Sequence, residues 1–351
     1  MLLSRLATAS SELAATRSRI AKRGIIVDVL RDVSAEDVAV VVSYLSGSLR
    51  QRRTGVGWRS LSALPPAAAE PSLTVQKVDE RFAAIAELAG PGSATARTEL
   101  VNELFSRATA SEQDLLRGLI FGELRQGALD AQVQEGLAVA FEVPLPTVRR
   151  AAMLLSSTVA AAELLVSGGV AALDAVGLQV GTAVQPMLAA SAPDPEGALT
   201  KTGLPAAVDY KLDGIRVQVH RQGDDIRVFT RSLEDITPRV PEVVATVAAL
   251  PNQQLVLDGE ALAVRPDGRP EVFQVIASRT ASHVDVAGMA EQTPLIAYFF
   301  DLLHVDGRDL LDTPLRERLE VMADVLPDEL IVPRQVCTDL EQVSRVFTDA
   351  P

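Results

Sequence analysis

The segment of residues 209–216 combines residue types that are suited to covalent chemistry. It reads Asp-Tyr-Lys-Leu-Asp-Gly-Ile-Arg, so that Lys211 follows an apolar run and precedes an Asp-Gly turn. The chain has 33 basic residues, yet lysine occurs only at positions 22, 77, 201 and 211. Arginine stays protonated near neutral pH, whereas a lysine amine can lose its proton and attack an electrophile. Lys211 is therefore a candidate nucleophile, and the alternative is an ordinary surface lysine in a hairpin.

Two loops in the first half carry a second set of candidate residues. Residues 46–59 contain four arginines and three glycines within an acidic protein. Guanidinium groups, together with backbone amides that glycine leaves accessible, are suited to binding phosphates. A second loop holds Arg125 in a turn between two glycines. We therefore predict that Arg50, Arg52, Arg53 and Arg125 bind phosphates, with a solvated loop as the alternative in each case.

The composition of the chain excludes several classes of protein. A formal net charge of −13 argues against binding of polyanions over the whole surface, although arginines can still gather on one face. The single cysteine, Cys337, excludes an internal disulfide and a cysteine-rich metal site, and it fits a reducing cytoplasm. The three histidines lack metal-ligand spacing. The apolar stretch of residues 159–173 is too short to span a bilayer and contains Glu163, so we expect no membrane partner.

The hydrophobic pattern changes from helical to strand-like near residue 180. Before this point apolar residues recur at helical spacing. From residue 206 the period becomes two, and Ile215, Val217 and Val219 alternate with polar residues. We expect an all-α domain at residues 1–183 and an α+β domain with antiparallel sheets at residues 184–351. Helices are expected at 75–88, 95–108, 111–119, 131–141, 238–250 and 314–326, and strands at 215–219, 226–230, 254–264, 295–303 and 330–332.

Four short motifs in the second half match a known family in their order and spacing. They are Lys211-x-Asp213-Gly214-x-Arg216, Thr230-Arg231-Ser232, Asp258-Gly259-Glu260 and Phe300-Asp301-Leu302-Leu303. Together they resemble the nucleotidyltransferase domain of the ATP-dependent DNA ligases, above all the archaeal-type and actinobacterial enzymes often called ligase B. The first half, with its Gly-x-Leu-Arg-Gln-Gly stretch, is similar to the DNA-binding domain of those ligases. Each motif alone recurs by chance, whereas four in register indicate a shared chemistry.

The resemblance implies a role for each matching residue. Lys211 matches the nucleophile that attacks the α-phosphate of ATP, so that a lysyl-N-AMP intermediate forms and pyrophosphate leaves. The AMP then passes to the 5′-phosphate at a nick in double-stranded DNA, and the 3′-hydroxyl displaces it. Mg²⁺, bound mainly through substrate oxygens, is the expected metal. The other matches are Arg216 and Arg231 for the nucleotide and the nick, Glu260 for a ribose hydroxyl or the metal, Phe300 for stacking on adenine, and Asp209 for an adenine contact. In such a ligase, the phosphates that Arg50, Arg52, Arg53 and Arg125 are predicted to bind would be those of DNA.

Some of these residues have structural alternatives. Phe300 is also compatible with a core position, Arg231 with a solvated strand, and the segment Asp258-Gly259 with a hairpin turn. Asp209 stands two residues before the lysine, where members of the family often have glutamate.

The resemblance also sets expectations for the chain as a whole. It implies a helical DNA-binding domain followed by an α+β nucleotidyltransferase domain, which is ATP-grasp-like and incomplete at its C-terminus. The protein is expected to be a cytoplasmic, nucleoid-associated monomer. In relatives a Glu-Gly strand, a Lys-x-Lys strand and an OB-fold domain follow, and the sequence stops before them at Pro351. We therefore expect the 351-residue chain alone to form lysyl-AMP slowly or not at all, and not to seal nicks.

Three other functions remain open on the sequence. RNA ligases and mRNA capping enzymes share the motifs, but the large helical domain disfavours them. A non-catalytic nick-binding or regulatory protein would keep the fold and lose the distal motifs. An NAD⁺-dependent ligase is disfavoured because that class carries an additional N-terminal domain and a cysteine-rich zinc finger.

Overall fold

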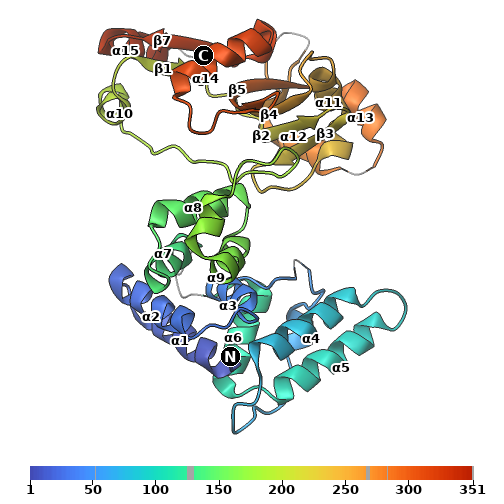
Figure 1. The fold of residues 1–351 in the computed structure, drawn as a ribbon. Helices are drawn as coiled ribbons and strands as arrows, with labels where there is room; N and C mark the ends of the chain where they lie inside the picture. Colours follow the sequence, from blue (N-terminus) through green and yellow to red (C-terminus); the bar gives the residue numbers. More distant parts are fainter. Residues whose placement is uncertain (52, 125–129, 266–268, 283, 350–351) are drawn as a thin grey trace. The chain divides into compact units, whose positions relative to one another are not determined.

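The computed structural model describes residues 1–51, 53–124, 130–265, 269–282 and 284–349. The chain divides into two compact units, Met1–Gly177 and Leu178–Pro351 (Figure 1). The expected division at residues 183 and 184 falls a few residues after this boundary. The first unit is helical and the second combines helices with antiparallel sheets, as expected. None of the described helices has the length and apolarity that crossing a bilayer would require.

The first unit is built from helices packed around one apolar core. Its central helix, α3 (Val38–Leu45), has all 8 residues buried, because it is apolar on nearly every side. It packs against α1 (Leu3–Ala15), α4 (Val75–Glu87) and α9 (Thr158–Asp174). The other helical elements are α2 (Arg19–Arg31), the 3-10 turn η1 (Trp58–Leu61), α5 (Ser93–Ser106), α6 (Ala110–Phe121), α7 (Asp130–Ala140) and α8 (Leu145–Leu154).

The ends of α6 follow directly from its sequence. At the start, Thr109 and Glu112 form a capping box, in which the backbone N–H of Thr109 donates to the Glu112 carboxylate at 2.8 Å. At the other end Gly122 adopts φ +65°, a left-handed conformation that glycine reaches at little cost. The helix predicted at residues 111–119 is thus confirmed, and it stops where the second arginine loop begins.

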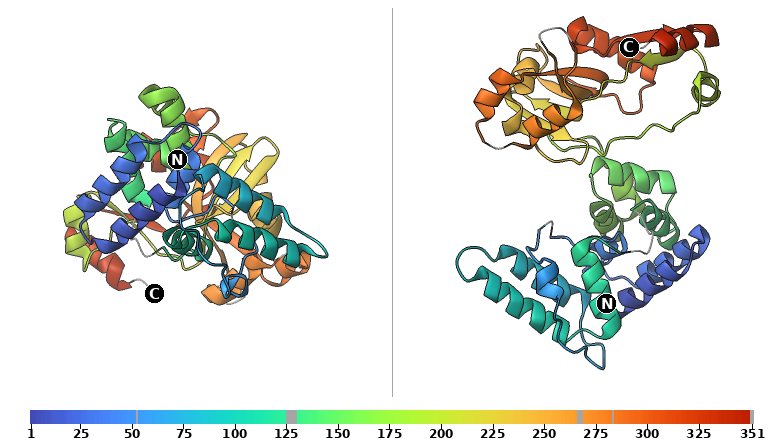
Figure 2. Two further views of the ribbon diagram at one scale, coloured as in Figure 1. Left: turned by 90° about the horizontal axis from the view of Figure 1, so that it is seen from below. Right: turned by 180° about the vertical axis from the view of Figure 1, so that it is seen from behind.

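The second unit contains a five-stranded antiparallel sheet and a separate two-stranded sheet. The strands are β1 (Ala206–Asp209), β2 (Ile215–Gln222), β3 (Asp225–Thr230), β4 (Gln254–Ala263), β5 (Leu295–Val305), β6 (Arg308–Asp309) and β7 (Arg334–Cys337). The large sheet has the order β3-β2-β4-β5-β6, and the small sheet pairs β1 with β7. The helices are α10 (Pro195–Thr202), α11 (Pro241–Ala248), α12 (Phe273–Ala281), α13 (Val286–Gln292), α14 (Leu315–Val325) and α15 (Leu340–Asp349). Figure 2 shows α10 and α15 near the small sheet, and the two helices contact each other.

Strand β2 shows the predicted period of two. Val217 and Val219 are fully buried and share a core with residues of α11 and α14. The residues that alternate with these valines, Arg216, Gln218 and His220, point to the opposite face. This polar face is also covered, since Gln218 is only 5% and His220 only 1% exposed.

A connecting segment, residues 181–187, covers the polar face of β2, and we call it the strap. The ring nitrogen Nδ1 of His220 accepts a hydrogen bond from the backbone N–H of Gly181 at 3.0 Å. The amide of Gln218 exchanges two hydrogen bonds with the backbone of Val184, at 2.7 and 3.2 Å. Since Nδ1 of His220 accepts, its Nε2 carries the proton and donates to Gln218 at 2.8 Å. This network therefore requires a neutral His220.

Burial of His220 makes the stability of the second unit depend on pH. Desolvation, together with the nearby charges of Arg227 and His304, lowers the pKa of His220 from 6.5 to about 4. The unfolded chain therefore binds a proton at higher pH than the folded chain does. We expect the free energy of unfolding to decrease as the pH falls from about 6.5 to about 4, by roughly 3 kcal/mol from this residue.

Denaturant unfolding of the wild type and of His220→Gln across this pH range measures the effect. The variant should be less stable near pH 7, because its side chain cannot reproduce the ring contacts, but it should lose less stability on acidification. Carboxyl groups titrate in both proteins, so the difference between the two curves isolates His220. Parallel curves would contradict a neutral buried histidine.

The last strand, expected around residues 330–332, lies later in the chain, and at the expected position Ile331 forms a single bridge to Phe299. A 3-10 turn occupies Asp328–Leu330, and β7 begins only at Arg334. Pro333 explains the shift, because it has no N–H to donate to a strand ladder. The backbone N–H of Val332 instead donates to β5, at 2.9 Å, so this segment attaches the small sheet to the large one.

Candidate active site

A pocket of about 1000 Å³ opens in the second unit. It lies where β1, β2, β4 and β5 bring their motif residues together, with the loop after β3 beside them. All the residues that the motifs assigned to the nucleotide line this pocket: Asp209, Lys211, Arg216, Arg231, Glu260 and Phe300. The lining also includes Ala189, Tyr210, Leu212, Gly214, Ile215, Thr230, Ser232, Phe273 and Val332.

Lys211 lies in the loop between β1 and β2, at the wall of the pocket. Its side chain is 83% exposed, and its Nζ lies 3.1 Å from a carboxylate oxygen of Asp213, which is 78% exposed. Ion pairs between exposed groups are weak and readily exchanged for other partners. The backbone N–H of Gly214 donates to Glu260 at 3.2 Å and ties this loop to β4. The amine is therefore accessible on an anchored loop.

Glu260 is half-buried on β4, directly opposite Arg216 on β2. Burial raises the pKa of its carboxyl, while the hydrogen bond from Gly214 and the positive charges of Lys211 and Arg216 oppose that rise. One carboxylate oxygen accepts the bond from Gly214. The carboxylate thus lies between the lysine and the arginine, where it can accept hydrogen bonds or bind a cation.

Arg216 is held in place by a buried counter-ion, Asp258. Its Nε and a terminal nitrogen donate to the two carboxylate oxygens of Asp258, at 3.0 and 2.6 Å. Burial raises the pKa of Asp258, and the bonds from Arg216 act in the opposite direction. The remaining terminal nitrogen of Arg216 donates to the carbonyl of Met187 in the strap, at 3.1 Å. The guanidinium group is therefore fixed at the edge of the pocket.

The neighbouring residues Phe299 and Phe300 on β5 show whether Phe300 lies in the core or in the pocket. Phe299 is fully buried in the core, so Phe300 must point to the opposite face of the strand. Phe300 is partly exposed and lines the pocket. The guanidinium carbon of Arg216 lies 5.5 Å from the centre of its ring, within the range of a cation–π contact. Phe300 is thus a pocket residue and not a core residue.

The two other predicted residues have contrasting surroundings. Arg231 follows β3 and is exposed. Among the described residues, its side chain has no hydrogen-bond or ion-pair partner. Its guanidinium group is available to an anionic ligand. Asp209, in contrast, binds Arg334 through both carboxylate oxygens. The pocket therefore combines an exposed amine, one free and one fixed guanidinium group, a carboxylate and an aromatic ring.

Comparisons with known proteins identify the family. The model described as "ATP dependent DNA ligase domain" matches residues 186–350, and the one described as "DNA ligase N terminus" matches residues 59–138. A curated "Probable DNA ligase" from Beutenbergia cavernae is 56% identical over 359 aligned residues, which cover 100% of this chain and 69% of the relative. The chain belongs to the ATP-dependent DNA ligase family.

Further relatives agree with this assignment. "Probable DNA ligase" proteins from Nocardioides sp. and Kineococcus radiotolerans are 55% and 52% identical, each over 97% of this chain, and over 66% and 67% of their own lengths. The chain thus spans about two thirds of the length of these curated relatives. Among solved structures, Pmar-Lig_PreS3 has a TM-score of 0.58 at 17% identity, covering 98% of this chain and 69% of that one. This likeness shows a shared fold. The resemblance seen in the motifs is confirmed, and the alternatives of an RNA ligase or capping enzyme are not favoured.

In this ligase chain the arginines predicted to bind DNA differ in their availability. Arg50 donates to the carboxylate of Asp79 on α4 at 2.8 Å, so it anchors its loop to the helical unit. Arg53 is exposed. Arg52 and Arg125 lie outside the described residues.

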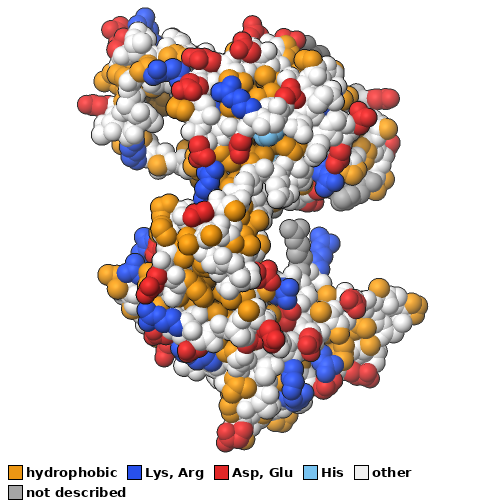
Figure 3. Space-filling view, viewed as in Figure 1, with side chains coloured by type: hydrophobic (Ala, Val, Ile, Leu, Met, Phe, Trp, Pro, Cys, Tyr) orange, Lys and Arg blue, Asp and Glu red, His pale blue; other side chains and the backbone are white. Residues whose placement is uncertain are grey.

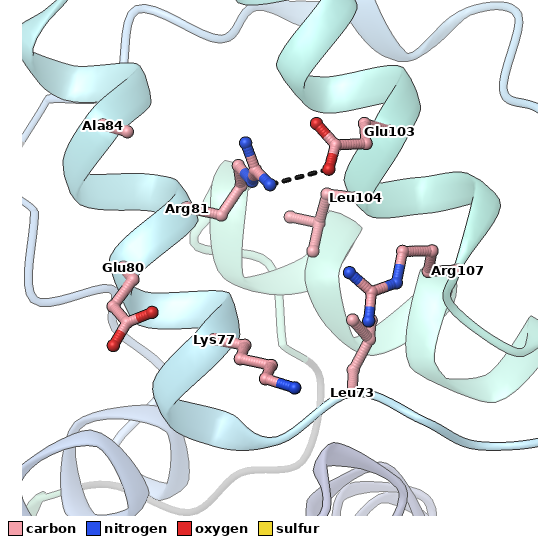
Figure 4. Close-up of a pocket in the computed structure, with 8 residues that line it drawn as sticks. All are labelled: Leu73, Lys77, Glu80, Arg81, Ala84, Glu103, Leu104 and Arg107. Carbon is pink, nitrogen blue, oxygen red and sulfur yellow. Dashed lines mark hydrogen bonds and ion pairs between the residues drawn. The ribbon is translucent and has the colours of Figure 1, made fainter.

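A second groove of the ligase chain, of about 350 Å³, is lined by residues of α4 and α5 (Figure 4). Its charged lining residues are Lys77, Glu80, Arg81, Glu103 and Arg107. Arg81 and Glu103 form an ion pair of 2.7 Å across the groove, so much of its charge is balanced. On the face shown in Figure 3, acidic and basic side chains are likewise interspersed over each unit. The pocket of the second unit is therefore the stronger candidate for the active site.

Sequence reasoning missed two side chains that contact the residues of this site. The motif Asp258-Gly259-Glu260 includes Asp258, but its role as the counter-ion of Arg216 appears only when β2 and β4 pair. Arg334 belongs to none of the motifs. The one local signal was an arginine directly after a proline, at the start of a short strand.

Proposed function

We propose that the second unit transfers AMP from ATP to Lys211 and then to the 5′-phosphate of nicked DNA. In the first step the lone pair of Nζ attacks the α-phosphorus, a P–N bond forms, the bond to pyrophosphate breaks, and Nζ loses a proton. A 5′-phosphate oxygen of DNA then takes the AMP from the lysine. Finally the 3′-hydroxyl attacks the activated phosphate and AMP leaves. The observation that carries this proposal is the exposed amine of Lys211 in one pocket with every other nucleotide-motif residue.

The surroundings of the lysine support these roles. Phe300 offers an aromatic face on which a purine base can stack. Arg216 and Arg231 supply positive charge for phosphate oxygens. Glu260 can accept a hydrogen bond from a ribose hydroxyl. Asp209 lines the same pocket, two residues before the nucleophile.

Mg²⁺ fits this site through Glu260. In the described part of the chain no three His, Cys, Asp or Glu side chains converge to hold a metal. Mg²⁺ is commonly held by one or two carboxylates together with phosphate oxygens of the substrate, which is what a single half-buried glutamate provides. Such an ion would neutralise charge on the phosphates of ATP. Glu260 already has one oxygen bound to a backbone N–H, which fixes its orientation.

We assign nicked duplex DNA to the helical unit. This rests on the match to the N-terminal ligase model and on the exposed Arg53 in a glycine-rich loop. In this proposal residues 1–183 form the DNA-binding domain, and residues 184–351 belong to an ATP-grasp-like nucleotidyltransferase domain. The protein acts as a monomer on the nucleoid.

Transfer of label from ATP tests the proposed function. With Mg²⁺ and ATP labelled on the α-phosphate, we expect label to appear slowly on the protein, over a long incubation, and then on nicked DNA that carries a 5′-phosphate. Nicked DNA with a 5′-hydroxyl is the matched control and should receive none. Label transfer is measured in place of sealing, because the chain spans only about two thirds of its relatives. Equal labelling by GTP, or transfer to nicked RNA alone, would contradict a DNA ligase that uses ATP. Nick binding without any labelling would favour a non-catalytic binder.

A further inference from the structure

Arg334 links the small sheet to the pocket through three hydrogen bonds. It lies on β7, directly opposite Asp209 on β1. Its Nε donates to one carboxylate oxygen of Asp209, and a terminal nitrogen donates to the other at 2.7 Å. The same terminal nitrogen donates to the backbone carbonyl of Phe300 at 2.9 Å. One side chain therefore joins β1, β7 and β5.

The burial of Arg334 distinguishes this link from an ordinary surface ion pair. Its side chain is 13% exposed, and that of Asp209 is 35% exposed. A planar guanidinium group bound to both oxygens of a carboxylate fixes orientation as well as distance. The backbone supports the same connection, because the N–H of Tyr210 donates to the carbonyl of Pro333 at 3.1 Å. Neither strand can shift past the other without breaking several of these bonds.

The link joins two opposing parts of the active site. Asp209 lies two residues before Lys211, whereas Phe300 provides the aromatic face of the pocket. A shift of β1 relative to β5 would change the distance from the amine to a base stacked on Phe300, and so to the α-phosphate. Small errors of this kind slow a reaction that depends on close approach.

We infer that Arg334 and Asp209 form a positioning pair that holds Lys211 at a set distance from Phe300. This inference rests on the proposed function, because the distance matters only if Lys211 attacks a nucleotide whose base stacks on Phe300. Both carboxylate oxygens of Asp209 bind Arg334, so its side chain anchors the strand of the nucleophile.

Arg334→Lys tests the inference with little loss of charge. A lysine can still pair with Asp209, but it has no planar fork with which to bind the Phe300 carbonyl at the same time. We expect the rate constant of labelling at saturating ATP to fall about tenfold, in line with the loss of one or two charge-assisted hydrogen bonds at a reacting site. The thermal unfolding midpoint should stay close to that of the wild type. Arg345→Lys is the matched control, since Arg345 is an exposed arginine paired with Glu341 on α15, and it should leave the rate unchanged.

Hydrogen–deuterium exchange without ATP separates this inference from the proposed function. In Arg334→Lys we expect faster exchange in residues 208–214 and 298–302, with the rest of the second unit unchanged. Unchanged exchange in both segments would overturn the positioning pair, and so would a loss of labelling that only parallels a loss of folded protein. If neither this chain nor a longer protein that contains it carries label on Lys211, the proposed function fails, and the exchange result still decides whether Arg334 holds the two segments.

Discussion

Replacing Lys211 with alanine is expected to reduce transfer of AMP from ATP to the protein by at least about 10³-fold, because alanine has no nucleophilic nitrogen. ATP should still bind, since the aromatic face of Phe300 and the guanidinium groups of Arg216 and Arg231 remain. The measurement is the amount of acid-labile label on the denatured protein after long incubation with labelled ATP and Mg²⁺. It applies to this chain and to any longer protein that contains it.

The second unit offers a matched control for this experiment. Its other lysine, Lys201, donates to the carbonyl of Ser191 at 2.6 Å and does not line the pocket. Lys201→Ala should therefore be labelled like the wild type. If label persists in Lys211→Ala, or disappears in Lys201→Ala, the nucleophile has been assigned to the wrong residue.

Replacing Gly214 with alanine is expected to impair both the fold of the nucleophile's loop and its chemistry. A Cβ atom at this position would lie 2.3 Å from the backbone carbonyl oxygen of Ala261 and 3.1 Å from Cγ of Glu260. Because the first contact is with the backbone of a central strand, the loop must move instead. Overpacking of this kind costs about 1–3 kcal/mol. It would also break the bond from the Gly214 N–H to Glu260, and a displacement of about 1 Å can slow a reaction by roughly 10²-fold.

Two measurements follow the effect of Gly214→Ala: the free energy of unfolding and the rate of labelling. Gly24→Ala, in α2, is the control, because a Cβ atom there has nothing within 4 Å. That variant should be neutral or stabilised by up to about 1 kcal/mol, as a glycine within a helix costs conformational entropy. Wild-type labelling by Gly214→Ala would show that the loop has more freedom than its contacts indicate.

Much of the site was predictable because it depends on residue types and on spacings between near neighbours in the sequence. Lys211 stood out by residue type, and the period of two along β2 predicted which of its side chains share a face. On β5 the sequence left a core position open for Phe300, and the alternation along the strand separates Phe299 in the core from Phe300 in the pocket. The helical half was predictable for the same reason, since helical periodicity and caps such as Thr109 with Glu112 depend only on neighbours in the chain.

Which acid each arginine binds was not predictable from the sequence. The sequence did not indicate that Arg50 binds Asp79, or that Asp209 binds Arg334. A long arginine side chain can reach any of several acids, and which one it meets depends on the register of strands and helices that are far apart in the sequence. No local pattern contains that information.

The sequence by itself therefore determined the chemistry of this ligase chain: an amine, two guanidinium groups, a carboxylate and an aromatic ring in motifs of set spacing. The tertiary structure alone decided how they are arranged and which remain free. The strap buries the polar face of β2 and fixes Arg216, and the start of β7 after Pro333 places Arg334 opposite Asp209. Both outcomes depend on hydrogen bonds between segments that are distant in the sequence. Side chains of β2 bond to the backbone of the strap, and the backbone of β1 pairs with that of β7.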